Sequence, residues 1–434
     1  MLSYYLNLAL RSLKRNTVLT ALMVLAIALG IGASMTTLTV WHALSGDPLP
    51  GKSAKVFRVQ LDPRDRQGYR PGVKPPDQVT WIDGMNLLHA NRGKRQALMT
   101  AGNVSVYPAR ASIEPFFEGA RFTSAGFFPM FEVPFLYGHA WRVSDDRRRA
   151  RVVVISRQLN ARLFNGDDST GKMLNIGNHD LQIVGVLDTW RPSPRFYDLS
   201  SGSYRAAASV FLPLSTSRDL KYAHSGDTDC WGKGSSSEEM LETASCTWLQ
   251  FWVELDAPAK AAEYRQFLVH YSQQQKALGR FQRPPNIRLS NVMQWLDAHD
   301  VLPGSVLAQA WLAFGFLLVC LVNTVGLLLA KFLRRAGALG VRRAMGASRW
   351  TLFAQLLVES GVVGVLGGAF GLSFACLGLW FVRRQPTEYA DLAQLDPFML
   401  LTTIAAAIAA SLIAGILPAW RACRITPAVQ LKGS

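Results

Sequence analysis

The stretch TVLTALMVLAIALGIGASMTTLTV, Thr17 to Val40, decides the fold class because it contains no charged residue. About 20 apolar residues in a helix suffice to cross a hydrocarbon core roughly 30 Å thick. A cleaved signal peptide has a shorter apolar stretch and a clear cleavage site marked by small residues, which this segment lacks. The sequence therefore predicts a retained transmembrane helix at residues 17–40.

Three further apolar stretches lie near the other end of the 434-residue chain, at residues 306–330, 357–382 and 398–417. Each is near or above the length that a membrane span requires. A polar segment, residues 41–304, separates them from the first helix. We therefore expect an α-helical membrane protein with four transmembrane helices, one before and three after a large mixed α+β extracytoplasmic domain.

The segment between the first two helices has readable local patterns. Residues 56–61, 152–155 and 248–255 resemble strands, whereas residues 259–278 and a short amphipathic stretch presenting Leu159 and Leu163 resemble helices. Gly177 and Asn178 interrupt an alternating apolar pattern and predict a hairpin turn. The Gly- and Ser-rich stretch at residues 201–237 predicts an exposed insertion.

Charge predicts the orientation, because loops that stay in the cytoplasm are rich in Lys and Arg. Residues 1–16, 331–351 and 418–434 carry basic but no acidic residues. The loop at residues 383–397 instead balances Arg383 and Arg384 with three carboxylates. Both termini should therefore be cytoplasmic and the large domain outside. This arrangement explains much of the net charge of +16 without nucleic acid.

The stretch FNGDDSTGKMLN, Phe164 to Asn175, has the glycine and lysine spacing of a phosphate-binding P-loop. A P-loop needs Ser or Thr after the lysine to hold Mg²⁺, and it leads into a helix. Here Met173 follows Lys172, and the next residues alternate as in a strand. We interpret the stretch as a turn outside the cytoplasm that binds no nucleotide.

We find no catalytic motif, since zinc-ligand spacing and a G-x-S-x-G elbow are both missing from the sequence. The chain is expected to have no catalytic, cofactor-binding or metal-binding residue and to be no enzyme. Cys230 and Cys246 lie in one polar external loop, where an oxidising compartment permits a disulfide. We predict that bridge, with two unpaired thiols as the alternative.

Four stretches together resemble the MacB/FtsX family of ABC-transporter permeases. They are NLALRSLKRN before the first helix, RFTSAGFFPMFEVPFLYGHAW (121–141), VVVISRQLNARLFNGDDSTGKMLNIGNHDLQIVGVLDTW (152–190) and NTVGLLLAKFLRRAGALGVRRAMGASRWTLFAQLLVES (323–360). The resemblance covers nearly the whole chain in matching order. Ala338 departs from it, because the family usually has Glu there, and the insertion near residue 200 has no obvious counterpart.

Residues 334–349 are a candidate docking element, because arginines and small residues lie together between two predicted spans. The resemblance implies a coupling helix seated on an ATPase subunit; a basic loop without a partner is the alternative. The candidate coupling residues are Arg334, Arg335, Gly340, Arg342, Arg343, Ala344, Gly346, Ala347 and Arg349. ATP and Mg²⁺ are expected in that separate ATPase.

Polar residues and glycines inside the predicted spans are further candidates. Glu359 is the only acid placed within a span, and beside Gln355 it favours an interfacial hydrogen bond over a proton relay. Asn323 is expected to bond across helices. Gly364 with Gly368, and Gly367 with Gly371, form two G-x-x-x-G pairs that suit packing within one chain or a dimer seam equally well.

These observations predict the membrane subunit of a bacterial ABC system, in the inner membrane with a periplasmic domain. A separate ATPase would hydrolyse ATP, and this chain would convert that event into movement of its external domain, for export or extraction of a substrate. The resemblance implies a second permease copy or a similar chain, and a periplasmic adaptor as a further partner. The alternatives are a membrane-anchored ligand receptor without an ATPase and, third, an external hydrolase.

Overall fold

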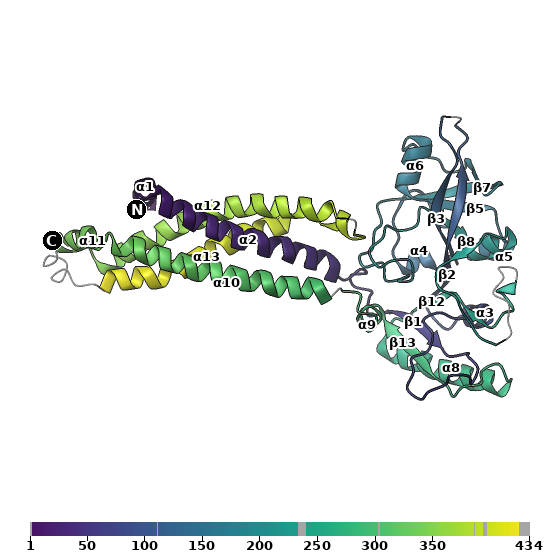
Figure 1. Ribbon diagram of the computed structural model, residues 1–434. Helices are drawn as coiled ribbons and strands as arrows, with labels where there is room; N and C mark the ends of the chain where they lie inside the picture. The colour runs from purple at the N-terminus through teal and green to yellow at the C-terminus, as the bar shows by residue number, and fades with distance from the viewer. Residues whose placement is uncertain are drawn as a thin grey trace. The chain divides into compact units, whose positions relative to one another are not determined.

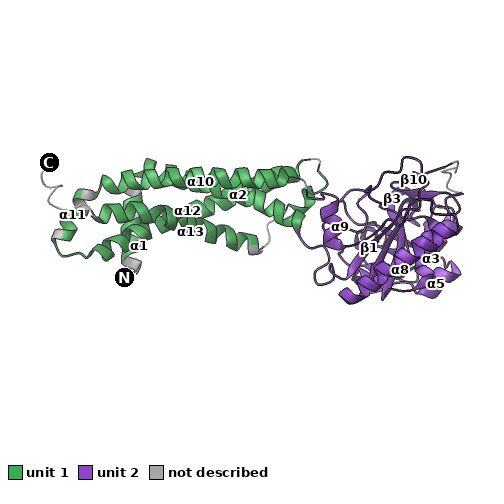
Figure 2. Cartoon of the chain, turned by 90° about the horizontal axis from the view of Figure 1, so that it is seen from below, with its two compact units in different colours: residues 1–45, 302–434 green, residues 46–301 purple. Residues whose placement is uncertain are grey.

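A computed structural model describes residues 2–110, 112–232, 240–302, 304–385, 387–393 and 397–424. The chain divides into two compact units (Figure 2), one formed by residues 1–45 with 302–434 and the other by residues 46–301. The first unit is helical, and the second holds all the described strands. This division confirms the predicted fold class, a mixed α+β domain inserted after the first apolar helix.

Four described helices of the first unit are long and apolar enough to cross a membrane: α2, α10, α12 and α13. The helical elements of this unit are α1 (Leu2–Arg15), α2 (Thr17–Ser45), α10 (Gly304–Leu333), α11 (Ala336–Ala344), α12 (Arg349–Arg383), the 3-10 turn η2 (Ala390–Leu392) and α13 (Pro397–Arg424). Within the unit, α2 and α13 each contact α10 and α12, and α1 contacts α12 (Figure 1).

The long helices extend past the apolar stretches that predicted them. Helix α12 begins at Arg349, well before residue 357, because Ser348 Oγ accepts a hydrogen bond from Thr351 N at 3.1 Å and caps it. Helix α13 continues through Pro418 to Arg424. Apolar composition marks the part of a helix suited to hydrocarbon, whereas caps decide where the helix ends. The predicted tail beyond residue 424 and Asp396 lie outside the described residues.

The second unit alternates strands with short helices. Its strands are β1 (Val56–Leu61), β2 (Arg95–Tyr107), β3 (Phe116–Thr123), β4 (Phe135–Gly138), β5 (Val152–Ile155), β6 (Met173–Ile176), β7 (His179–Leu187), β8 (Val210–Pro213), β9 (His224–Ser225), β10 (Asp229–Cys230), β11 (Cys246–Thr247), β12 (Gln250–Glu254) and β13 (Ile287–Asn291). Its helices are α3 (Trp81–Ala90), α4 (Phe127–Met130), α5 (Val143–Arg148), α6 (Arg157–Phe164), α7 (Leu214–Asp219), α8 (Pro258–Ala277) and α9 (Val292–Ala298).

Most of the described strands form one mixed sheet. Its order is β13-β1-β12-β2-β3-β8-β5-β7-β4, with β6 paired to β2 and β7, and β9 paired to β2. Only the β3–β8 and β5–β7 pairs are parallel. The predicted hairpin joins β6 to β7, with Gly177 and Asn178 both at positive φ, as a tight two-residue turn requires.

The prediction of an exposed insertion at residues 201–237 was wrong for part of that stretch. Strand β8 lies inside the sheet between β3 and β5, and Val210, Phe211 and Leu212 are fully buried. Glycine and serine around the strand hid a four-residue apolar run, VFLP. Lys233–Glu239, the part of the insertion before β11, lies outside the described residues.

Aromatic rings fill the space beside α4. Phe127 makes edge-to-face contacts with Phe131 at 4.9 Å and with Tyr197 at 5.6 Å between ring centroids. Such ring pairs contribute about 0.5–1.5 kcal/mol each beyond the burial of their area. The sequence stretch 121–141, which carries the resemblance to the family, therefore supplies much of this packing.

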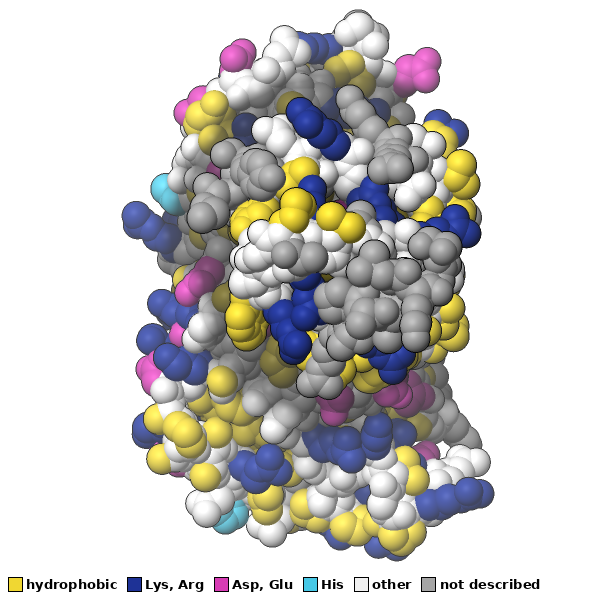
Figure 3. All heavy atoms as spheres, turned by 90° about the vertical axis from the view of Figure 1, so that its left-hand side faces the viewer, with side chains coloured by type: hydrophobic (Ala, Val, Ile, Leu, Met, Phe, Trp, Pro, Cys, Tyr) yellow, Lys and Arg dark blue, Asp and Glu magenta, His cyan; other side chains and the backbone are white. Residues whose placement is uncertain are grey.

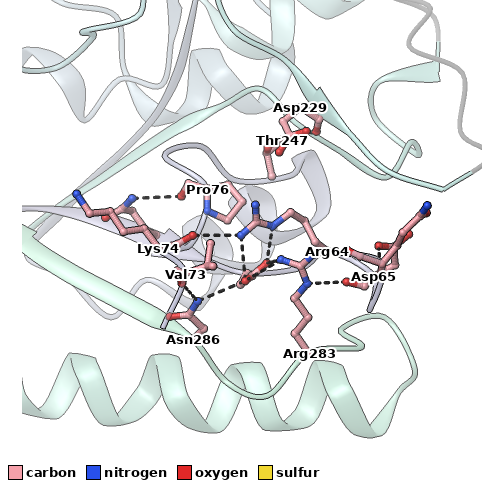
Figure 4. A network of polar contacts seen from close by, with 12 residues as sticks. Arg64, Asp65, Val73, Lys74, Pro76, Asp229, Thr247, Arg283 and Asn286 are labelled. Atoms are coloured by element: carbon pink, nitrogen blue, oxygen red, sulfur yellow. Dashed lines mark hydrogen bonds and ion pairs between the residues drawn. The ribbon is translucent and has the colours of Figure 1, made fainter. Parts of the chain in front are cut away.

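A buried carboxylate organises the loop after β1 (Figure 4). Asp62 accepts hydrogen bonds from Arg64 Nε at 2.8 Å and from Asn286 at 3.3 Å, and Arg283 lies 3.4 Å away. Burial alone would raise the pKa of Asp62, but the hydrogen bond and charge of Arg64, with the charge of Arg283, lower it overall. The network ties this loop to the connection between α8 and β13.

Candidate functional site

The segment between α10 and α12 contains a short helix, α11, between two turns. Gly346 follows this helix with φ of +100°, a conformation that costs a residue with a side chain about 1–2 kcal/mol. Ser348 then caps α12. The glycine and the cap together explain why the chain reverses here instead of continuing as one helix.

Three large apolar side chains in and around the turn after α11 are exposed. Val341 is 54% exposed, Met345 76% and Trp350 79%. Figure 3 shows the side of the molecule on which Figure 1 labels α11, and there hydrophobic side chains share the face with Lys and Arg. We name Val341, Met345 and Trp350 the apolar patch. Sequence reasoning missed it because it considered only the arginines and the small residues.

The predicted coupling arginines differ in what they contact. Arg342 donates to Gln355 Oε1 at 3.0 Å, and Arg343 donates to the carbonyl oxygen of Cys423 at 3.2 Å. Both are half-buried, so contacts within the chain already engage these two candidate coupling arginines. Arg334 and Arg349 are exposed. The exposed part of the segment is therefore more apolar than predicted.

The small residues of this segment also differ in position. Ala347 is half-buried and packs against the core of the helical unit. Gly340 is half-buried within α11, and Gly346 has open space where a Cβ would lie. The side chain of Ala344 lies outside the described part of the chain.

Glu359 lies in a buried cluster of charges that joins three helices. Its Oε1 is 2.6 Å from Lys331 Nζ, and the two side chains are 2% and 0% exposed. Ser12 Oγ of α1 donates to the same carboxylate. We name Ser12, Lys331, Arg335 and Glu359 the charge cluster.

Arg335 connects the charge cluster to α11. Its guanidinium lies 3.7 Å from Glu359, donates to Ser12 Oγ and also donates to the Ser12 carbonyl oxygen at 3.1 Å. Arg335 is the residue just before α11, and Gln355, bonded to Arg342, lies one turn from Glu359 on α12. Both ends of α11 are thus tied to the helices that continue into the apolar bundle.

The sequence identified Glu359 but not its partner. It favoured an interfacial hydrogen bond, whereas the structure shows an ion pair as well. Lys331 was interpreted only as a charge that orients the membrane helix. A buried carboxylate without a counter-charge is costly, so a search for cations at the ends of neighbouring helices would have suggested Lys331.

The remaining polar candidate, Asn323, does not make the expected bond within the chain. It lies on the exposed side of α10, and its side chain forms no hydrogen bond with any residue that the structure describes. A bond across helices stays a prediction for Asn323, because its side chain is exposed, whereas the neighbouring Thr324, about 100° further round the helix, is buried.

The glycine pairs of α12 pack against helices of the same chain. A Cβ on Gly364 or Gly368 would lie 2.6 Å or 2.9 Å from side-chain atoms of α13. A Cβ on Gly367 or Gly371 would lie 2.7 Å or 3.1 Å from side-chain atoms of α2. Of the two alternatives, the structure therefore supports packing within one chain.

Cys230 and Cys246 form a disulfide between the paired strands β10 and β11. Cys246 is fully buried in the core of the second unit. We expect peptide mapping without reductant to recover the two cysteines in one linked species, from protein made in its native compartment. Recovery of both as free thiols would contradict the structure and an oxidising location for this domain.

The stretch that resembles a P-loop is an exposed turn between α6 and β6. Gly166 and Gly171 both have positive φ, and Lys172 lies 5.1 Å from the ring centroid of Phe164. A strand follows, not the helix whose N-terminus would hold phosphates. No group of His, Cys, Asp and Glu suited to a metal ion occurs among the described residues either.

We therefore expect Lys172→Ala to leave nucleotide handling unchanged. The Lys172 side chain lies over the Phe164 ring in a turn that leads into a strand, so its loss removes no part of a phosphate-binding helix N-terminus. The measurement is ATP hydrolysis by the purified chain, which should show no activity above background in either form. Specific hydrolysis that Lys172→Ala abolishes would contradict this interpretation.

Comparisons with known proteins agree with this arrangement. A profile described as MacB-like periplasmic core domain matches residues 20–268, and one described as FtsX-like permease C-terminal matches residues 310–427. The macrolide export ATP-binding/permease protein MacB of Hyphomonas neptunium is 23% identical over 98% of this chain and 60% of its own length. Its namesake in Marinobacter nauticus is 23% identical over 97% and 59%.

The chain spans about three fifths of the length of these curated relatives. Among solved structures, the periplasmic region of MacB from Actinobacillus actinomycetemcomitans matches with 11% identity and a TM-score of 0.37. That match covers 58% of this chain and 95% of the other.

Proposed function

We propose that this chain is the membrane subunit of a bacterial ABC transporter. The chain belongs to the family of permeases with a MacB-like periplasmic core domain and an FtsX-like C-terminal domain, and this membership supports the proposal. A separate ATPase subunit binds and hydrolyses ATP with Mg²⁺. This chain converts that event into movement of the domain at residues 46–301, for export or extraction of a substrate. It holds no nucleotide itself.

The observation that carries the proposal is the way α11 is held. The residues of the apolar patch are exposed, while Arg335 and Arg342 tie the two ends of α11 to α1 and α12. An ATPase that binds the patch and moves would pull on both ends. Because the charge cluster joins α1, α10 and α12, these helices would move together.

The partners follow from the same proposal. An ATPase subunit occupies the apolar patch, and a second copy of this chain or a similar permease completes the transporter. A periplasmic adaptor is a further partner of the external domain. The glycine pairs of α12 are engaged within the chain, so the dimer contact uses another surface.

A topology experiment tests the placement that this function requires. Met345 and Met173 are exposed in the two different units, at 76% and 54%. We expect Met173→Cys to react with an impermeant maleimide in cells with a permeabilised outer membrane, and Met345→Cys only after lysis. The three free cysteines, Cys320, Cys376 and Cys423, are first replaced by alanine. The reverse labelling pattern would contradict a cytoplasmic α11.

A further inference from the structure

A wide cleft opens in the unit formed by residues 46–301. Its volume is about 1410 Å³, more than the roughly 300–1,000 Å³ of pockets that hold small molecules. Its lining includes residues of α3, the start of β2, α5 and α7. These elements are far apart in sequence, so the fold, not a local turn, creates the cleft.

Part of the lining of the cleft is apolar. Trp81, Met85 and Leu88 line the cleft from one face of α3, at the i, i+4, i+7 spacing of a helical stripe. All three are only half-buried, because the core beneath covers part of each. Val143 of α5, 58% exposed, also lines the cleft. The unit thus leaves one side of an amphipathic helix without a complete cover.

Two packed aromatic side chains also line the cleft. Phe128 and Trp141 meet edge to face at 4.7 Å and are 2% and 3% exposed. Trp141 Nε1 donates to Asp146 Oδ1 at 2.9 Å, which fixes the indole. A flat or chain-like apolar group would therefore meet a preformed surface.

The acidic groups that line the cleft already have partners. Asp219 pairs with Arg149 and Arg151 at 3.1 and 3.0 Å, and Glu242 pairs with Arg218 at 3.1 Å. Glu132 lies 3.2 Å from Lys52. Asp146 accepts from Ala125 N at 2.8 Å as well as from Trp141. A cationic ligand would have to displace one of these contacts.

Two arginines of the same cleft are available. Arg142 and Arg147 both line it and are exposed, and neither side chain makes an ion pair or a hydrogen bond with another described residue, although the charge of Arg142 is one of the causes that lower the pKa of Asp145. Guanidinium groups are well suited to carboxylate, sulfonate or phosphate oxygens. The cleft therefore offers an apolar surface together with unpaired positive charge.

We propose that this cleft binds an amphipathic organic anion. Its apolar part lies against Trp81, Met85 and Leu88, and its acidic group lies at Arg142 and Arg147. That such anions are the transported substrates rests on the proposed function, whereas binding itself needs no ATPase.

The test uses two probes with the same aromatic rings, of which only one carries a sulfonate group. 1-Anilinonaphthalene-8-sulfonate is an aromatic anion whose fluorescence rises in an apolar site, and N-phenyl-1-naphthylamine has the same rings without the sulfonate. Both are titrated into the full chain in lipid nanodiscs, and the signal of empty nanodiscs is subtracted. We expect saturable binding of the sulfonate, with weaker binding of the neutral probe.

The double variant Arg142→Gln/Arg147→Gln should weaken sulfonate binding about tenfold or more, because two charge-assisted contacts are lost. It should leave the neutral probe unchanged. The matched control Arg70→Gln/Arg110→Gln removes the same charge from exposed positions that do not line the cleft. It should bind both probes as the unmodified chain does.

Three outcomes would overturn the proposal: no saturable signal above empty nanodiscs, equal weakening in the control, or sulfonate binding unaffected by loss of the two arginines. None of them bears on ATPase binding, which is measured separately with α11 variants. Failure of the cleft and failure of the proposed function can therefore be told apart.

Discussion

Met345→Glu is expected to weaken binding of the ATPase subunit about 30-fold to 1000-fold. Met345 is 76% exposed and lies between the other members of the apolar patch in sequence. A central apolar anchor of an interface commonly contributes about 2–4 kcal/mol, and a carboxylate buried in its place has no partner. Those energies correspond to the stated change in affinity. The measurement is the amount of ATPase that co-purifies with the chain at matched expression.

Met173→Glu is the matched control for this prediction. It introduces the same side chain at a position that is 54% exposed in the other unit, so it should retain full ATPase binding. If the unmodified chain, Met345→Glu and Met173→Glu bound the ATPase equally well, the apolar patch would not be part of the proposed interface. The receptor without an ATPase would then be the better interpretation.

Met345→Glu is also a cleaner probe than changes suggested by sequence alone. Gly346→Leu would strain the turn, because Gly346 has φ of +100° while no atom lies near its missing side chain. Charge reversal at Arg342 and Arg343 would break contacts to Gln355 and Cys423 within the chain. Loss of binding in those variants would not separate docking from damage to the segment.

Glu359→Leu is expected to destabilise the helical unit by about 3–5 kcal/mol, since it leaves Lys331 buried without a counter-charge. The Lys331 side chain is 0% exposed, so its charge would be buried without a partner. The measurement is the midpoint of unfolding when SDS is titrated into the protein in mixed micelles. The midpoint should fall well below that of the unmodified chain.

The double variant Lys331→Met/Glu359→Leu separates lost attraction from lost packing. It removes both charges and keeps comparable volume, so most of the stability should return. Arg335, whose side chain is 25% exposed, can turn toward solvent in this variant. If the double variant were as unstable as Glu359→Leu, the loss of stability in Glu359→Leu would not be caused by the unpaired charge of Lys331.

The sequence was sufficient to predict the helical architecture because each span is a contiguous apolar stretch, as in Thr17 to Val40. It was also sufficient for the β6–β7 hairpin, since Gly177 and Asn178 are adjacent and favour positive φ. Features of this kind depend on neighbouring residues alone. Strand β8 was missed because its four apolar residues are too few to stand out among glycine and serine.

The candidate site depended on contacts between distant residues. Ser12, Lys331 and Glu359 come from three helices, and no local pattern links them. Arg343 and the carbonyl oxygen of Cys423 meet only because α11 lies beside the end of α13. The exposure of Met345 and Trp350 likewise depends on the turn at Gly346. The glycine in the sequence indicates a turn, but it does not predict the directions of the side chains on either side of it.

The proposed transmission of movement can be measured directly by hydrogen–deuterium exchange. The full chain is placed in nanodiscs with its ATPase subunit, and exchange across residues 46–301 is compared with and without ATP. The account predicts an ATP-dependent change in that domain with the active ATPase, and none with an ATPase that binds but does not hydrolyse ATP. Identical exchange in the presence and absence of ATP, with the active ATPase bound, would contradict it.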